Sequence, residues 1–307
     1  MNITVEPQRM SALLGSVATI VAVRCTTLGL KRIDKEAGVQ SDRAHNAKEG
    51  TSTSSVCRLP GEGERRIKEI KSAANATINA VKERTMAFGS SGWLLANTLI
   101  EPTLREFTAG KAEYDRLVAS FEQEVPRLIS QAWANIGTYK VEPPTEEECM
   151  GAFTMEFDMQ AIPDSASFHG SNISREMEAA IQRRLEESCK AAYAMAQQDA
   201  IQRLAEPLQN VVKGLDKYNE READIAAGKT VDKSRIFRDS LIGNVQQIAE
   251  VFSAFNLTGD PAMQNIIDDL ETFKGIEADD LRNSVDLRKQ ITSKAQDILA
   301  NLGDWVS

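Results

Sequence analysis

Carboxylates are the residues of this 307-residue chain that come closest to a catalytic pattern. Glu147 lies in an acidic run, and Glu156 and Asp158 follow it two positions apart. Such oxygens bind hard metal ions and can act as paired general acids and bases. The same residues also fit a solvated helix start followed by the water-facing side of a strand. We therefore expect surface carboxylates here and keep a metal-dependent hydrolase built on these three residues as an alternative.

Histidine and cysteine, the other residues with reactive side chains, are sparse. His45 and His169 are the only histidines, and both lie among Gly, Ser, Asn and Asp, which is typical of loops. The four cysteines are too far apart in sequence to form a metal-binding pair, and we expect reduced, buried thiols at Cys25, Cys57, Cys149 and Cys189. Glycine-rich phosphate-binding loops and a nucleophile elbow are missing from the sequence. The sequence thus predicts a protein that is not an enzyme and needs neither a metal nor a cofactor.

A group of basic residues lies on or beside a helix expected over residues 64–88. Its members are Arg58, Arg65, Arg66, Lys68, Lys71, Lys82 and Arg84. The chain as a whole carries a formal charge of −9, so this surface is a local exception. Basic surfaces bind nucleic acid through its phosphates, but no aromatic residue interleaves these positions to stack on bases. Two interpretations stay open: a solvated helix face, or a nucleic-acid-binding accessory protein that uses this helix.

Apolar residues in the second half of the chain repeat with the spacing of a helical seam. Their steps alternate between three and four, which places them on one side of a helix, at Ile201, Leu204, Leu208, Val211, Leu215 and Tyr218. An earlier stripe opens the same helical region, at Met177, Ile181, Leu185, Ala192 and Met195. The later seam predicts either a bundle core within one chain or an interface between copies. Because a continuous helix over 174–218 is longer than a compact domain needs, we expect an oligomer interface at the later seam.

Two segments, 16–30 and 152–162, alternate with the period of a strand among the helical stripes. We expect them to pair in a small antiparallel sheet packed on long helices, followed by a C-terminal helical bundle. The predicted fold is therefore α+β and mostly α, with coiled-coil-like seams. Its predicted parts are a strand, long-helix and strand region over 1–164 and a helical region over 165–307.

Local signals predict several interruptions. Residues 34–55 are polar and end in a Gly/Ser/Thr-rich tract, so we expect a mobile loop. The first long helix carries its apolar stripe to Phe88 and should end at Gly89. A second helix begins near Pro102 and should kink or stop at Pro126, because proline removes a backbone hydrogen bond.

The segment 10–23 has the length of a signal-peptide core, but Ser16 and Thr19 interrupt it and Arg24 occupies the cleavage region. No run approaches the roughly 20 apolar residues of a membrane span. We expect a cytoplasmic protein with no membrane partner.

The element order over 16–164 resembles a family of unknown function found in bacteriophages and Proteobacteria. The residues that carry the resemblance are VEPPTEEEC at 141–149 and FTMEFDMQAIP at 153–163. Members of that family are often encoded near MoxR-like AAA ATPases, which implies an adaptor or assembly role, in the host cytoplasm if the protein is phage-encoded. Together with the apolar seams, this predicts a non-enzymatic, self-associating interaction protein and an AAA ATPase as a partner; the alternative is the nucleic-acid-binding accessory protein.

Overall fold

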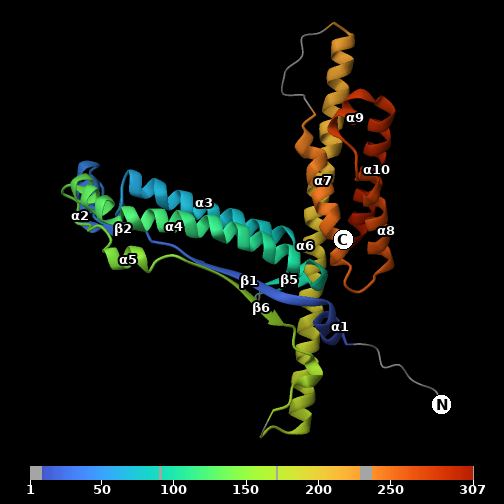
Figure 1. The fold of residues 1–307 in the computed structure, drawn as a ribbon, viewed down its shortest axis with the longest axis horizontal. Coiled ribbons are helices and arrows are strands. Elements are labelled where there is room, and N and C mark those ends of the chain that lie inside the picture. The colour runs from blue at the N-terminus through green and yellow to red at the C-terminus, as the bar shows by residue number, and fades with distance from the viewer. Residues whose placement is uncertain (1–8, 90–91, 171, 229–236, 307) are drawn as a thin grey trace. The chain divides into compact units, whose positions relative to one another are not determined.

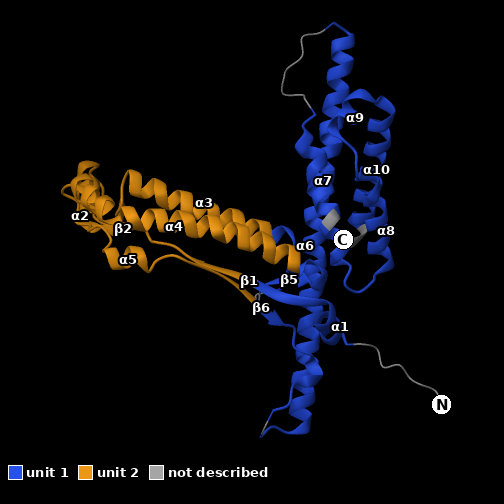
Figure 2. Cartoon of the chain, viewed as in Figure 1, with its two compact units in different colours: residues 1–21, 82–100, 159–307 blue, residues 22–81, 101–158 orange. Residues whose placement is uncertain are grey.

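The computed structural model describes residues 9–89, 92–170, 172–228 and 237–306, and these are mostly helical with a small antiparallel sheet (Figure 1). The predicted α+β, mostly α, fold is confirmed. Contacts divide the chain into two compact units (Figure 2). Unit 1 comprises Met1–Val21, Lys82–Ile100 and Met159–Ser307, and unit 2 comprises Ala22–Val81 and Glu101–Asp158. The division does not coincide with the predicted boundary after residue 164, because the chain leaves unit 1 and returns to it twice.

Unit 1 is built on the long helix α6 (Arg175–Ala226), which begins at the capping residue Ser174. Later in the chain, its described helices are α7 (Asp239–Phe252), α8 (Pro261–Leu270), α9 (Ala278–Asn283) and α10 (Val285–Val306). Helices α7 and α10 pack along the later part of α6 (Figure 1). Burial of their apolar faces forms one continuous core, which is the predicted C-terminal helical bundle.

The sheet contributes the other part of unit 1. Its strand order is β4-β5-β1-β6, with bounds β1 (Ala18–Thr26), β4 (Met86–Ala87), β5 (Trp93–Ala96) and β6 (Thr154–Ala161). Strand β1 pairs antiparallel with β5, with Ala18 opposite Ala96 and Val21 opposite Trp93. Strands β1 and β6 fall within the two segments whose alternation predicted strands, and they are neighbours in the sheet. Residues before β1 form a helix that the sequence did not predict, α1 (Met10–Val17).

Unit 2 is built on a pair of long antiparallel helices, beside the adjoining parts of β1 and β6. Helices α3 (Glu62–Glu83) and α4 (Ile100–Ile136) lie side by side (Figure 1). Aromatic rings join α4 to β6 and to the residue before it: the ring centroids of Phe107 and Phe157 are 5.1 Å apart, and those of Phe121 and Phe153 are 5.4 Å apart. These contacts fix which face of the alternating strand is buried, as its period of two requires.

The predicted mobile loop at 34–55 is wrong. Those residues include helix α2 (Lys35–Ala44), and strands β2 (Lys31–Asp34) and β3 (Ser54–Cys57) pair on either side of it. The physical reason is a buried carboxylate: Asp42 is 2% exposed and accepts hydrogen bonds from the backbone amides of Gly50, Thr51 and Ser52. One side chain thereby satisfies the polar backbone of the turn.

Prolines and helix ends account for the other differences. A kink or a stop was predicted at Pro126, and the stop does not occur, because helix α4 continues through this residue. The α6 helix is likewise one element across Pro207. Helix α3 ends at Glu83 rather than Phe88, because Met86 enters strand β4. The short helix α5 (Glu146–Met150) has the expected cap, Thr145, which forms a full capping box with Glu148.

Candidate functional site

The predicted oligomer interface lies in the core of unit 1. Each of its residues is at most 8% exposed: Ile201, Leu204, Leu208, Val211, Leu215 and Tyr218. Helices α7 and α10 of the same chain cover this seam. Of the two predicted arrangements, the structure therefore shows a bundle core within one chain. The side chains of this seam do not form a surface for a second copy.

An apolar surface is instead exposed on the earlier part of α6. We call it the α6 stripe, and it consists of Met177, Ile181, Leu185, Ser188, Ala192 and Met195. Steps of 4, 4, 3, 4 and 3 place these residues on one side of the helix. Met177 is 55% exposed, Leu185 40% and Met195 58%, although large apolar side chains are usually buried. The large apolar side chains Met177, Leu185 and Met195 are therefore exposed on this helix face, whereas Ile181 and Ala192 are half-buried.

A groove runs beside the α6 stripe within unit 1. It has a volume of about 410 Å³ and is bordered by Leu185, Ala192 and Met195 of the stripe. The opposite wall comes from the sheet and the chain after it, at Ile20, Phe88, Ile162 and Pro163. Cys189 also borders the groove, and burial raises the pKa of its thiol. The groove is thus an apolar recess with a neutral thiol, suited to receiving an apolar side chain.

Glu186 of α6 holds helix α1 against a face of α6 that differs from the face of the stripe. Its carboxylate accepts hydrogen bonds from the backbone amide of Met10, at 2.6 Å, and from the hydroxyl of Ser11, at 2.6 Å. The hydroxyl of Ser165 donates to the same carboxylate at 3.1 Å. Glu186 follows Leu185 by one residue, about 100° further round the helix. Helix α1 is therefore held against a different face, and the α6 stripe stays uncovered.

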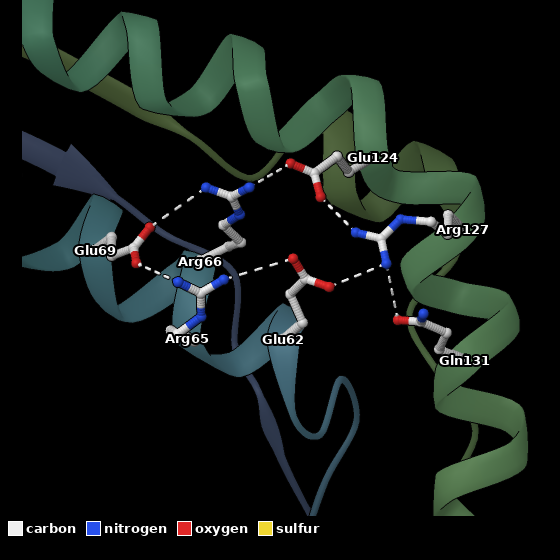
Figure 3. Close-up of polar contacts among 7 residues, drawn as sticks. All are labelled: Glu62, Arg65, Arg66, Glu69, Glu124, Arg127 and Gln131. Atoms are coloured by element: carbon white, nitrogen blue, oxygen red, sulfur yellow. Dashed lines mark hydrogen bonds and ion pairs between the residues drawn. The ribbon is translucent and has the colours of Figure 1, made fainter.

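Most members of the basic group on α3 contact carboxylates. Arg66 lies 2.7 Å from Glu124 of α4 and 3.7 Å from Glu69, and Arg65 lies 3.3 Å from Glu69 (Figure 3). The network continues through Glu62, which lies 3.5 Å from Arg65 and 3.0 Å from Arg127 (Figure 3). The guanidinium of Arg127 holds the pKa of Glu62 below its ordinary value. These cations join α3 to α4 and balance negative charge.

The remaining basic residues have separate environments. Arg58 is 8% exposed and donates to Glu148 at 2.6 Å and to the carbonyl oxygens of Glu142 and Pro143. Lys68 lies 2.8 Å from Glu64. In unit 1, the ammonium of Lys82 lies 5.2 Å from the ring centre of Trp93, and Arg84 also has an interaction partner. Only Lys71 of the predicted group is without a partner among the described residues. A nucleic-acid phosphate would have to compete with these contacts.

The candidate metal ligands do not converge. Asp158 pairs with Arg24, and the described parts of the chain contain no group of three or more His, Cys, Asp or Glu residues that could hold a metal ion. His45 ends helix α2, and His169 contacts Glu178 at 2.6 Å. All four cysteines lie in the described part of the chain and are free thiols; Cys149 is buried as predicted, but the prediction is wrong for Cys25, Cys57 and Cys189, which are only partly buried. Burial raises the pKa of Cys149 to about 11, which keeps that thiol protonated and unreactive at neutral pH.

Among the described helices, none is both long enough and apolar enough to cross a bilayer. Comparisons of the chain with protein-family models, with curated proteins and with solved structures found no match.

Proposed function

We propose that this chain is a non-enzymatic interaction protein that self-associates through the α6 stripe. The observation that supports the proposal is the exposure of large apolar side chains along one helix face beside an apolar groove. This interface differs from the seam predicted from the sequence, which the bundle core occupies. In both the predicted and the proposed interface, helix α6 is the element that joins two copies.

The occupant we propose for the α6 stripe is the same stripe of a second copy. Its spacing is nearly symmetric about the midpoint between residues 186 and 187. In an antiparallel pair, Leu185 would therefore meet Ser188, Ile181 would meet Ala192, and Met177 would meet Met195 of the second copy. Each large residue near the centre then faces a small one, as close helix packing requires. The groove beside the stripe accepts the methionine side chains, which adapt readily to irregular surfaces.

Light scattering coupled to size-exclusion chromatography tests this pairing on the full chain. Leu185→Glu places a charge at the centre of the interface and should convert the dimer to a monomer with unchanged helical content. Ala194→Glu adds the same charge at an exposed position outside the stripe and should leave the dimer intact. A wild-type chain that stays monomeric over a wide concentration range would exclude self-association.

An AAA ATPase of the MoxR type is the second partner in the proposal, with the cytoplasm as the location. The support is the resemblance at 141–149 and 153–163, where α5 leads into β6. Co-purification of the tagged chain with a MoxR-like ATPase from the native host, followed by ATPase assays with and without the chain, tests it. Absence of both co-purification and any change in ATPase rate would remove this partner and leave self-association unaffected.

A further inference from the structure

A second hollow lies in unit 1, away from the residues of the α6 stripe. Its volume is about 390 Å³, within the usual range for small-molecule sites. Helices α6 and α7 provide most of the wall. Glu83, the last residue of α3, and Arg84, which follows it, complete the wall. Its apolar side consists of Ala200, Ile248, Val251, Phe252 and Phe255. The cavity therefore combines an apolar wall with a polar rim.

Pro207 of α6 interrupts the backbone hydrogen bonding of the helix beside this cavity. Pro207 has no N–H, so the carbonyl oxygen of Arg203 lacks its usual helical donor. Both residues line the cavity. The Arg203 side chain is held elsewhere, since it donates to the carbonyl oxygen of Lys82 at 2.7 Å and pairs with Asp199. The guanidinium of Arg203 is therefore held by protein groups.

Two carboxamide side chains on the rim of the cavity form no hydrogen bond within the described residues. Asn210 of α6 and Asn244 of α7 line the cavity, are exposed, and make no hydrogen bond with the described residues. Gln247 is different, because it donates to Glu83 at 2.8 Å. A carboxamide presents a donor and an acceptor side by side, the pattern that asparagine uses to bind the edge of a nitrogen heterocycle.

Charge on the lining cancels. Arg84 and Arg203 are balanced by Glu83 and Glu206. A phosphate or another strong anion would therefore meet no excess of positive charge. The geometry points to a binding site in this cavity for a neutral nitrogen heterocycle of nucleobase or nucleoside size, with its ring against the apolar wall and its polar edge toward Asn210 and Asn244.

Saturation-transfer NMR and calorimetry with adenine, adenosine, cytosine and cytidine test the site on the full chain. At least one of these probes should bind. Asn244→Trp, which fills the mouth from an exposed position, should weaken that binding by about tenfold or more. The double variant Asn210→Ala/Asn244→Ala should weaken it by a similar factor without filling the cavity. The control Gln209→Ala, an exposed amide on α6 that does not line the cavity, should change it less than twofold.

Three results would overturn the inference. The first is failure of all four probes to bind the wild-type chain at millimolar concentration. The second is binding that Asn244→Trp and the double variant leave unchanged while circular dichroism shows both to be folded. The third is adenosine monophosphate binding more than tenfold tighter than adenosine, because the neutral lining predicts no gain from a phosphate.

Discussion

Gly110 of α4 lies directly against Thr77 of α3 in unit 2. A Cβ atom built at residue 110 would lie 2.8 Å from the methyl carbon of Thr77 and still closer to its hydroxyl oxygen. Thr77 is 5% exposed and donates to the carbonyl oxygen of Ala73, so it has little freedom to move. The glycine that weakens α4 as a helix former is therefore what lets the two helices approach closely.

Gly110→Ala should destabilise the protein by about 1–3 kcal/mol, because the added methyl group overpacks the helix contact. Urea denaturation monitored by circular dichroism measures the change. Gly243→Ala is the matched control, since a Cβ there meets nothing within 4 Å on helix α7. That change should stabilise by roughly 0.5–1 kcal/mol through helix propensity. Equal effects of the two substitutions would show that helix propensity, and not the contact with Thr77, decides the outcome.

Leu208 is fully buried in the seam of α6, so its replacement should damage the fold of unit 1. Leu208→Ala should cost about 2–5 kcal/mol, and Leu208→Asp should remove much of the helical signal, because the core has no partner for a charge. Gln209→Asp, at the exposed neighbouring position, should have little effect. Release of folded subunits by Leu208→Asp would instead assign this seam to an interface between copies.

The two stripes on α6 show what the sequence can and cannot predict. Apolar spacing identified both as helix faces, and the structure confirms the helix. Spacing does not say what covers a face, however: Leu208 is covered by α7 and α10, and Leu185 is not. The seam predicted as an interface is therefore buried within the chain, and the exposed part of the helix could be recognised only once the positions of α7 and α10 were known.

Local polar contacts explain which other parts of the structure the sequence could not predict. Alternation over 152–162 predicted β6 because an entire strand face repeats the signal. The structure around Asp42 depends on one carboxylate and three amides of a later turn, which no periodic pattern records. The basic group was visible in the sequence, but its acceptors Glu124 and Glu148 come from segments far along the chain. Which of these distant segments form ion pairs could be recognised only from the structure.

Ion pairing on α3 predicts weak binding of nucleic acid. Arg65, Arg66 and Lys68 each contact a carboxylate, so binding to single- or double-stranded DNA at physiological salt should be negligible. Removing two of those carboxylates, in Glu62→Gln/Glu69→Gln, should increase binding at low salt by freeing the arginines. Filter binding over a range of salt concentrations measures both. Tight, salt-dependent binding by the wild-type chain that Arg65→Glu/Lys68→Glu abolishes would restore the nucleic-acid-binding alternative.

Glu186 should make the attachment of α1 depend on pH. Burial by itself raises the pKa of Glu186, but hydrogen bonds from the Ser11 hydroxyl, the amides of Met10 and Ser11, and the Ser165 hydroxyl outweigh it and lower the pKa below its ordinary value. A carboxyl whose pKa is lower in the folded state stabilises that state above its unfolded pKa, near 4.3, and loses this contribution as pH falls through the folded value.

Glu186→Gln should therefore lower the urea midpoint at pH 7, because one carboxamide oxygen cannot replace two charged acceptors and adds donors that face the same amides. Other carboxylates also titrate in acid, so the informative quantity is the difference in midpoint between wild type and variant. That difference should be constant from pH 7 to about 5.5, shrink below about 4.3, and disappear once Glu186 is protonated in the folded protein. Glu187→Gln, at the exposed next residue, is the control and should show no pH-dependent difference. A difference that persists unchanged into acid would mean that Glu186 holds α1 by shape and neutral hydrogen bonds, and not by its charge.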